Sequence, residues 1–196
     1  MARLVLLAGP NGAGKTTFAR VMFRDEIAAV QYLNADDEAA LINPLSVGEA
    51  ALRAARVLIN RRRASIAEGR DMVIETTLSG RGLLRDLRAA IERSYAIELH
   101  YLFSPTIELC IERVLFRVQR GGHGIPSEVI ARRFRRGLQL LPAVLHIADS
   151  YTIWNNQSFP EIIATMRARE QRVYDEKAWQ RLTEAMRMAS EGTADA

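Results

Sequence analysis

The residues best suited to chemistry form one short segment near the N-terminus, Gly-Pro-Asn-Gly-Ala-Gly-Lys-Thr-Thr. It fits the pattern G-x-x-x-x-G-K-T, in which backbone N–H groups and a lysine surround a row of phosphates. Its glycines allow tight turns and a close approach of the ligand to the backbone. The segment predicts that a nucleoside triphosphate binds here. The predicted nucleotide-binding residues are Gly9, Pro10, Asn11, Gly12, Ala13, Gly14, Lys15, Thr16 and Thr17.

Two side chains of this segment are expected to act on the phosphates directly. Lys15 would reach the β- and γ-phosphates, which makes it a candidate catalytic residue, and the Thr16 hydroxyl would hold Mg²⁺. The expected cofactors are therefore ATP (or GTP) and Mg²⁺.

Carboxylates follow two further predicted strands, at the sheet edge where ligands of open parallel sheets bind. Asp36 follows the strand at 30–33, and Glu75 lies near the end of the strand at 71–76. We expect Asp36 to deprotonate an acceptor hydroxyl, and Asp36, Glu75, Thr76 and Thr77 to bind the substrate. For Glu75 an outer-shell metal role stays open. The alternative for Asp36 is a solvated cap of a helix that starts near residue 37.

Arginines are crowded into residues 113–136, on both sides of the sequence Gly-Gly-His-Gly at 121–124. Guanidinium groups that close over a transferring phosphoryl group stabilise its negative charge. We therefore predict a helical, arginine-rich lid here. Most of its arginines must be solvated, and Arg117 and Arg133 are the preferred catalytic candidates. His123 is either a phosphate or lid contact or a simple turn residue.

Apolar runs that alternate with amphipathic segments predict the elements that position these residues. The pattern indicates an α/β fold: a kinase-type P-loop NTPase, built as a three-layer sandwich around a five-stranded, mainly parallel sheet. Strands are expected at 3–8, 30–33, 71–76, 96–103 and either 151–154 or 161–164. Helices are expected at 15–23, 48–67, 81–93, 106–119, 127–147 and 175–189.

The bulk composition fits one domain over residues 1–190 with a flexible tail at 191–196. No apolar run is long enough for a membrane span, and a strand from residue 3 leaves no room for a signal peptide. Together with a single cysteine, this favours a cytoplasmic location without membrane association. The net charge of +4 comes almost wholly from arginine, and no nucleic-acid motif accompanies it, so nucleic acid is not the expected partner.

Several blocks in order resemble the zeta toxin family, in particular its compact bacterial branch. These blocks span residues 3 to about 165 and are Gly9–Thr17, 34–36, 75–79, Arg113 and Arg117 before Gly121-Gly122-His123, Pro126 and 132–134. The resemblance implies a P-loop kinase that phosphorylates a hydroxyl of a UDP-linked amino sugar, and an antitoxin as a possible partner. It also implies that Lys15 and Thr16 bind nucleotide and metal, that Asp36 is the base and that Glu75 contacts substrate.

Together these features predict an ATP- and Mg²⁺-dependent kinase whose acceptor is an alcohol group of a small molecule, and the resemblance implies the toxin of a toxin–antitoxin pair. One alternative is a non-toxic kinase of a metabolite or nucleoside. Another is an NTP-hydrolysing switch that binds protein or RNA, although no Asp-x-x-Gly sequence follows the third strand. We expect segments 36–47 and 76–82 to shape the acceptor pocket.

Overall fold

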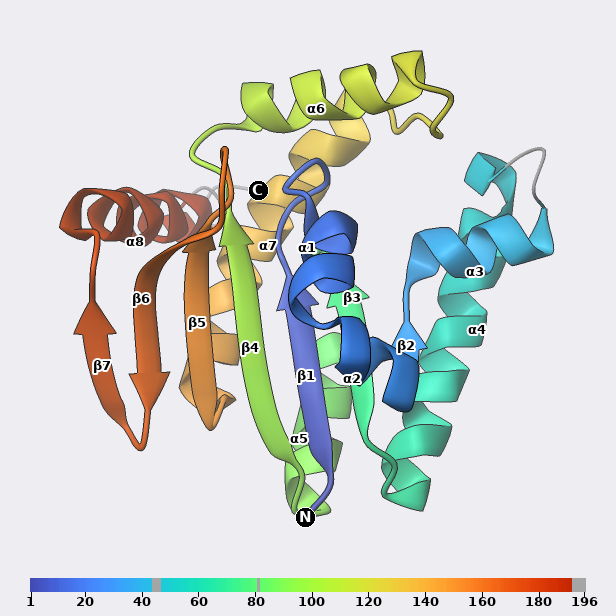
Figure 1. Ribbon diagram of the computed structural model, residues 1–196, viewed down its shortest axis with the longest axis vertical. Helices are drawn as coiled ribbons and strands as arrows, with labels where there is room; N and C mark the ends of the chain where they lie inside the picture. The colour runs from blue at the N-terminus through green and yellow to red at the C-terminus, as the bar shows by residue number, and fades with distance from the viewer. Residues whose placement is uncertain (44–46, 81, 192–196) are drawn as a thin grey trace.

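The computed structural model describes residues 1–43, 47–80 and 82–191. Within them, one seven-stranded sheet has the order β2-β3-β1-β4-β5-β6-β7 (Figure 1). The first five strands in this order are parallel, and β6 and β7 run antiparallel to their neighbours. The strands are β1 (Arg3–Ala8), β2 (Gln31–Leu33), β3 (Met72–Thr76), β4 (Ala96–Phe103), β5 (Ser150–Asn155), β6 (Glu161–Arg167) and β7 (Glu170–Val173).

The predicted α/β fold with a mainly parallel sheet is confirmed, but the predicted number of five strands is wrong. The two segments predicted as alternatives for the last strand, 151–154 and 161–164, both form strands, β5 and β6. The strand β7 extends the sheet further. A two-residue turn, Ala168-Arg169, joins β6 to β7, and both of its residues have positive φ. Such a hairpin usually carries Asn or Gly, and this turn therefore lacked the sequence signal by which it could have been predicted.

Helices cover both faces of the sheet and its carboxyl edge. They are α1 (Lys15–Met22), α2 (Arg24–Ala29), α3 (Ala35–Ile42), α4 (Val47–Glu68), α5 (Leu83–Glu92), α6 (Ile107–Gln119), α7 (Ser127–Ile147) and α8 (Glu176–Glu191). The short helix α2 was not predicted, and α3 was foreseen only in the alternative for Asp36, as a helix that starts near residue 37. The helix α8 includes the first residue of the predicted tail, and residues 192–196 lie outside the described ranges. None of the helices within those ranges combines the length and apolar character that a membrane crossing requires.

Alternation along the strands gives the sheet two buried faces. Leu4, Leu6 and Ile74 belong to the large core under α5, α7 and α8. Val5 and Leu7, on the same strand as Leu4 and Leu6, belong to a smaller core under α1 and α2. Figure 1 shows α1 and α2 on one side of the sheet and α5 and α7 on the other.

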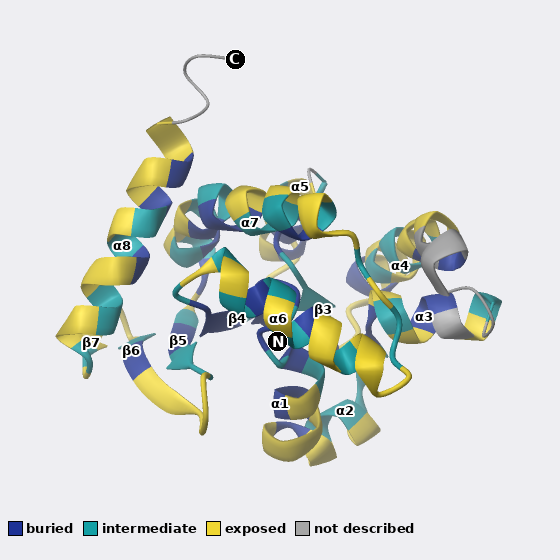
Figure 2. Cartoon of the chain, turned by 90° about the horizontal axis from the view of Figure 1, so that it is seen from above, coloured by how far each residue is buried: buried dark blue, intermediate teal, exposed yellow. Residues whose placement is uncertain are grey.

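The site-bearing elements meet at the carboxyl edge of the parallel strands. Seen from above this edge, α6 crosses over the sheet, with α3 and α4 at one side of it (Figure 2). The segment between β1 and α1 lies below α6, and α7 returns along the face that α5 also covers. This arrangement brings segments far apart in sequence to one place.

Candidate functional site

The segment between β1 and α1 forms a tight loop that depends on its glycines. Gly12 has a φ of 79°, and a Cβ atom there would lie 2.5 Å from the carbonyl oxygen of Cys110 in α6. A side chain at this position would therefore be strained and would also push α6 away from the loop. Among the described residues, no side chain caps α1, whose N-cap is Gly14. Its first N–H groups are therefore available to an anion.

Lys15 lies inside this loop and is only 7% exposed. Its Nζ atom donates a hydrogen bond to the carbonyl oxygen of Pro10 at 2.9 Å. Burial lowers the pKa of Lys15, while the carboxylates of Glu75 and Asp36 oppose that shift. The lysine is thus held as a desolvated cation close to two carboxylates.

Glu75 accepts hydrogen bonds from three side chains on neighbouring elements. Strand alternation directs Glu75 to the face that α1 covers, since Val73 and its partner Val5 belong to that face. Its donors are the hydroxyl of Thr16 at 3.0 Å, the hydroxyl of Tyr32 at 2.6 Å and the amide of Asn34 at 3.0 Å. Burial, together with the nearby charge of Glu75, raises the pKa of Tyr32.

This arrangement fits a magnesium ion at Thr16. Because the Thr16 hydroxyl donates a hydrogen bond to Glu75, the lone pairs of its oxygen stay available to a cation, and hard oxygen atoms are the ligands that Mg²⁺ prefers. Glu75 can also hold a metal-bound water. The loop, the uncapped helix end and Lys15 together fit a triphosphate.

Asp36 lies in the first turn of α3, where Asn34 caps the helix by accepting a hydrogen bond from the Asp36 N–H at 2.9 Å. Two lid residues approach its carboxylate. The Nε2 atom of His123 is 3.3 Å from Oδ1, and Arg117 Nη1 is 3.7 Å from Oδ2. Arg117 also donates to the backbone oxygen of His123 at 3.0 Å. The lid therefore meets the carboxylate that follows β2.

The other lid arginines differ in where they point. Arg133 lines the cavity described below, and burial lowers the pKa of its guanidinium while Asp36 opposes that shift. Arg113 donates to the backbone oxygens of Asn156 at 3.1 Å and Gln157 at 2.6 Å, and it approaches that of Gly12 at 3.4 Å. The lid residues that are exposed to solvent include Arg120, Arg132, Arg135 and Arg136.

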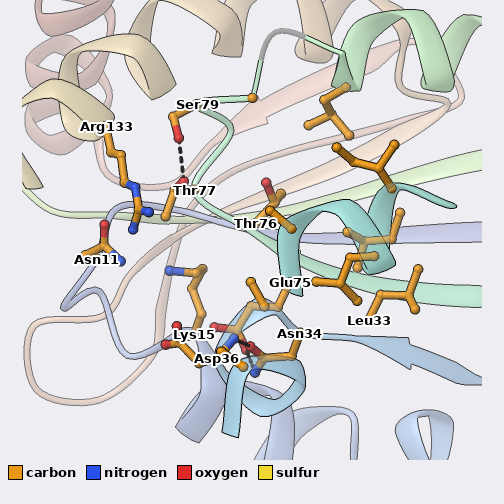
Figure 3. Close-up of a pocket in the computed structure, with 18 of the residues that line it drawn as sticks. Asn11, Lys15, Leu33, Asn34, Asp36, Glu75, Thr76, Thr77, Ser79 and Arg133 are labelled. Atoms are coloured by element: carbon orange, nitrogen blue, oxygen red, sulfur yellow. Dashed lines mark hydrogen bonds between the residues drawn. The ribbon is translucent and has the colours of Figure 1, made fainter. Parts of the chain in front are cut away.

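A cavity of about 510 Å³ adjoins these residues. Figure 3 shows Lys15, Asp36, Arg133 and Asn11 gathered at one end of the cavity, with Leu33 toward the other end. Thr76 and Thr77 also line it, and the Thr77 and Ser79 hydroxyls are hydrogen-bonded at 2.8 Å. Within the described residues, Asn11 Oδ1 and Arg117 Nε are buried without a hydrogen-bond partner. Unpaired buried polar atoms are costly, so Asn11 Oδ1, whose residue lines the cavity, is suited to a ligand.

The predicted segments 36–47 and 76–82 supply part of the cavity wall, although residues 44–46 and 81 lie outside the described ranges. The wall also includes α4, which the sequence did not indicate, and the start of α7, where Arg133 was predicted. Tyr32 and Asn156 were missed as site residues as well. Asn156 donates to the backbone oxygen of Ala13 at 2.8 Å, a contact across 143 residues that no local pattern reveals.

Comparison with known proteins supports the fold and the nucleotide loop. A family model described as an AAA domain, AAA_33, matches residues 4–143. An uncharacterized protein of Haemophilus influenzae is 28% identical over 132 residues, which make up 67% of this chain and 92% of that protein.

Solved structures of similar fold include chains of AvrRxo1-ORF1:-ORF2 and of the PezAT toxin–antitoxin system. A chain in the crystal structure of AvrRxo1-ORF1:-ORF2 with ATP is similar at a TM-score of 0.72 and 18% identity. The match covers 93% of this chain and 64% of that chain, so this protein spans less than two thirds of that relative. A chain from the PezAT toxin–antitoxin system of Streptococcus pneumoniae has a TM-score of 0.63 and 16% identity, over 97% and 87% of the two chains. At these identities, the likeness establishes the P-loop kinase fold alone.

Proposed function

The chain belongs to the AAA_33 family of AAA domains, and on that premise we propose that it is an ATP- and Mg²⁺-dependent kinase that phosphorylates a hydroxyl group of a small molecule. One observation carries the proposal: Lys15 of the phosphate-binding loop and Asp36 in the first turn of α3 line the same cavity. The space beside them is large enough for a small-molecule acceptor.

The nucleotide side of the reaction relies on the loop and on Thr16. In our proposal Lys15 binds the β- and γ-phosphates, and the loop N–H groups bind the remaining phosphate oxygens. Thr16 would hold Mg²⁺, with Glu75 fixing the direction of its hydroxyl. When bound, Mg²⁺ neutralises negative charge on the triphosphate.

The acceptor side relies on Asp36. The acceptor oxygen forms a bond to the γ-phosphorus, the bond from that phosphorus to the β,γ-bridging oxygen breaks, and the hydroxyl proton passes to Asp36. His123 and Arg117 orient the carboxylate, while Thr76 and Thr77 bind the acceptor with it. Arg117 and Arg133 stabilise the charge that spreads over the transferring group.

The test is incubation of the protein with ATP, Mg²⁺ and a bacterial metabolite extract, followed by mass spectrometry for species that gain one phosphate. Lys15→Ala and Asp36→Asn should each abolish the product. Asp37→Asn is the matched control, since this neighbouring carboxylate does not line the cavity. Hydrolysis of ATP without any phosphorylated species would contradict the kinase assignment, and full turnover by Asp36→Asn would contradict the role of the base.

The resemblance to zeta toxins and the fold shared with a chain of the PezAT toxin–antitoxin system support a finer proposal. In it, the protein is the toxin of a toxin–antitoxin pair, and a UDP-linked amino sugar is the first acceptor to test. Regulated expression in a bacterium distinguishes this from a non-toxic metabolite kinase. Wild-type protein should arrest growth and Lys15→Ala should not, whereas growth unaffected by the active enzyme would contradict the toxin role.

A further inference from the structure

The cavity extends from the reactive residues along one face of α4. Its wall on this helix contains Ala55, Leu58, Ile59, Arg62 and Arg63, whose spacing places them in one stripe. At the helical rise, the eight steps from Ala55 to Arg63 correspond to about 12 Å. The cavity is therefore longer than the transferred phosphate group and the acceptor hydroxyl together require.

The wall of this space carries apolar side chains from several elements. Leu58 and Ile59 of α4 face it together with side chains from four other parts of the chain. Those side chains are Leu33, Ile74, Leu83, Ile125, Pro126 and Val129. A ligand with a hydrocarbon body would remove this apolar surface from water, whereas a sugar would leave its hydroxyl groups without partners there.

The far end of the stripe carries an excess of positive charge. Arg62 Nε and Arg63 Nε donate to different oxygens of Asp86, at 3.0 and 3.1 Å, and Asp86 is buried. Arg85 is also 3.9 Å from this carboxylate, so three guanidinium groups surround one negative charge and the cluster carries an excess of positive charge. The side chain of Arg63 is 46% exposed, and within the described part of the chain only its Nε has a hydrogen-bond partner. Its outer nitrogens can therefore bind an anion.

From these three features we propose that the acceptor is an amphiphilic alcohol: a hydroxyl at Asp36, a hydrocarbon body along Leu58 and Ile59, and a carboxylate or phosphate at Arg62 and Arg63. This inference rests on the proposed kinase function and names the class of its substrate. Arg63 is then a residue that determines specificity, and the ion pair of Arg62 with Asp86 fixes the base of the pocket between α4 and α5.

The test compares ω-hydroxyalkanoates of increasing chain length with n-alkanols of the same lengths as acceptors. For the wild-type enzyme, kcat/KM should be highest for hydroxyalkanoates of intermediate length. In Arg63→Gln the ratio of kcat/KM between hydroxyalkanoate and alkanol should fall about tenfold, because a charge-assisted hydrogen bond is lost. Arg85→Gln is the matched control: Arg85 is 3.9 Å from the same Asp86 carboxylate but lies outside the cavity, and its ratio should stay at the wild-type value.

Failure of this inference can be told apart from failure of the kinase proposal. If the enzyme phosphorylates a species in the metabolite extract but prefers a UDP-linked amino sugar to every amphiphile, the kinase function stands and the amphiphile inference is wrong. An unchanged ratio in Arg63→Gln would likewise overturn it. If hydroxyalkanoates bind in calorimetry, more weakly to Arg63→Gln, but receive no phosphate, the ligand class is supported and the kinase proposal is contradicted.

Discussion

At the scale of single residues, Lys15 carries its positive charge in a buried site, where removal from water disfavours the charged form. Burial lowers its pKa despite two nearby carboxylates, so the protonated lysine destabilises the folded state. Lys15→Met should therefore raise the melting temperature at neutral pH while it abolishes phosphoryl transfer. Between the lowered pKa and the ordinary value, the unfolded chain binds more protons than the folded chain, so wild-type stability rises with pH. The advantage of the variant should shrink accordingly as pH approaches 10.5.

Thermal melting of both proteins at pH 7 and near pH 10 measures this effect. Lys177→Met is the control, since Lys177 is the other lysine and is exposed. A melting temperature of Lys15→Met below that of the wild type at neutral pH would show that the bond to Pro10 outweighs the cost of burial.

Glu75 allows a second prediction at this scale, because its three donors can be removed one at a time. Tyr32→Phe takes away one hydrogen bond to a charged group and should cost about 1.5 kcal/mol in unfolding free energy. Glu75→Gln should instead raise the Mg²⁺ concentration needed for half-maximal activity, since the carboxylate orients Thr16. Urea unfolding and a Mg²⁺ titration of both variants check this. A wild-type Mg²⁺ dependence in Glu75→Gln would exclude Glu75 from the metal site.

The sequence predicted candidate residues that line the cavity, such as Lys15 and Asp36, better than it predicted their hydrogen-bond partners. The glycine spacing from Gly9 to Gly14 and the position of Asp36 after a strand are local patterns. The bond from Tyr32 to Glu75 depends instead on how β2 pairs with β3, where Tyr32 lies opposite Val73. Partners set by strand register are not visible until the sheet is known.

At the scale of elements, α7 approaches the turn after β3 closely because residue 137 is a glycine. A Cβ atom at Gly137 would lie 2.7 Å from the carbonyl oxygen of Thr77. Alanine normally favours a helix interior over glycine by about 1 kcal/mol. Here the clash with rigid backbone should outweigh that gain, so Gly137→Ala should destabilise the protein by about 1–3 kcal/mol.

The same change should lower kcat/KM, because the turn carries Thr77 and already holds Leu78 at a positive φ of 55°. Urea unfolding and acceptor kinetics measure both effects. Arg136→Ala, an exposed neighbour on the same helix, should leave both unchanged. A gain in stability for Gly137→Ala would mean that the turn shifts without cost.

The bounds of an element could be predicted where its apolar pattern extends over many residues, but not where the element is short. The helix at 127–147 was expected with the bounds that α7 has. The helix α3 is only 8 residues long, and the sequence suggested it only in the alternative for Asp36, as a helix that starts near residue 37. Helices this short obtain their stability from tertiary contacts, which the local sequence does not display.

At the scale of the whole molecule, one core connects the nucleotide-binding strands with the C-terminal helix. Leu4 of β1, Ile163 of β6 and Leu182 of α8 belong to the same buried cluster. The family match ends at residue 143, yet β5, β6 and α8 complete this cluster. We therefore expect residues beyond the match to be required for the stability of the site-bearing part.

The two tryptophans of the chain make this expectation testable, because Trp154 is in β5 beside His100 and Trp179 is in α8. Trp179→Phe and Trp154→Phe each leave a single fluorescent reporter. In each variant, the fluorescence and circular dichroism transitions in urea should coincide, as they do in two-state unfolding. Adding Leu182→Ala should destabilise both by about 2–5 kcal/mol, because it opens a cavity in the shared core. If Trp179 fluorescence changed at lower urea than the circular dichroism signal of the same variant, the C-terminal elements would unfold separately, and the chain would not be one cooperative domain.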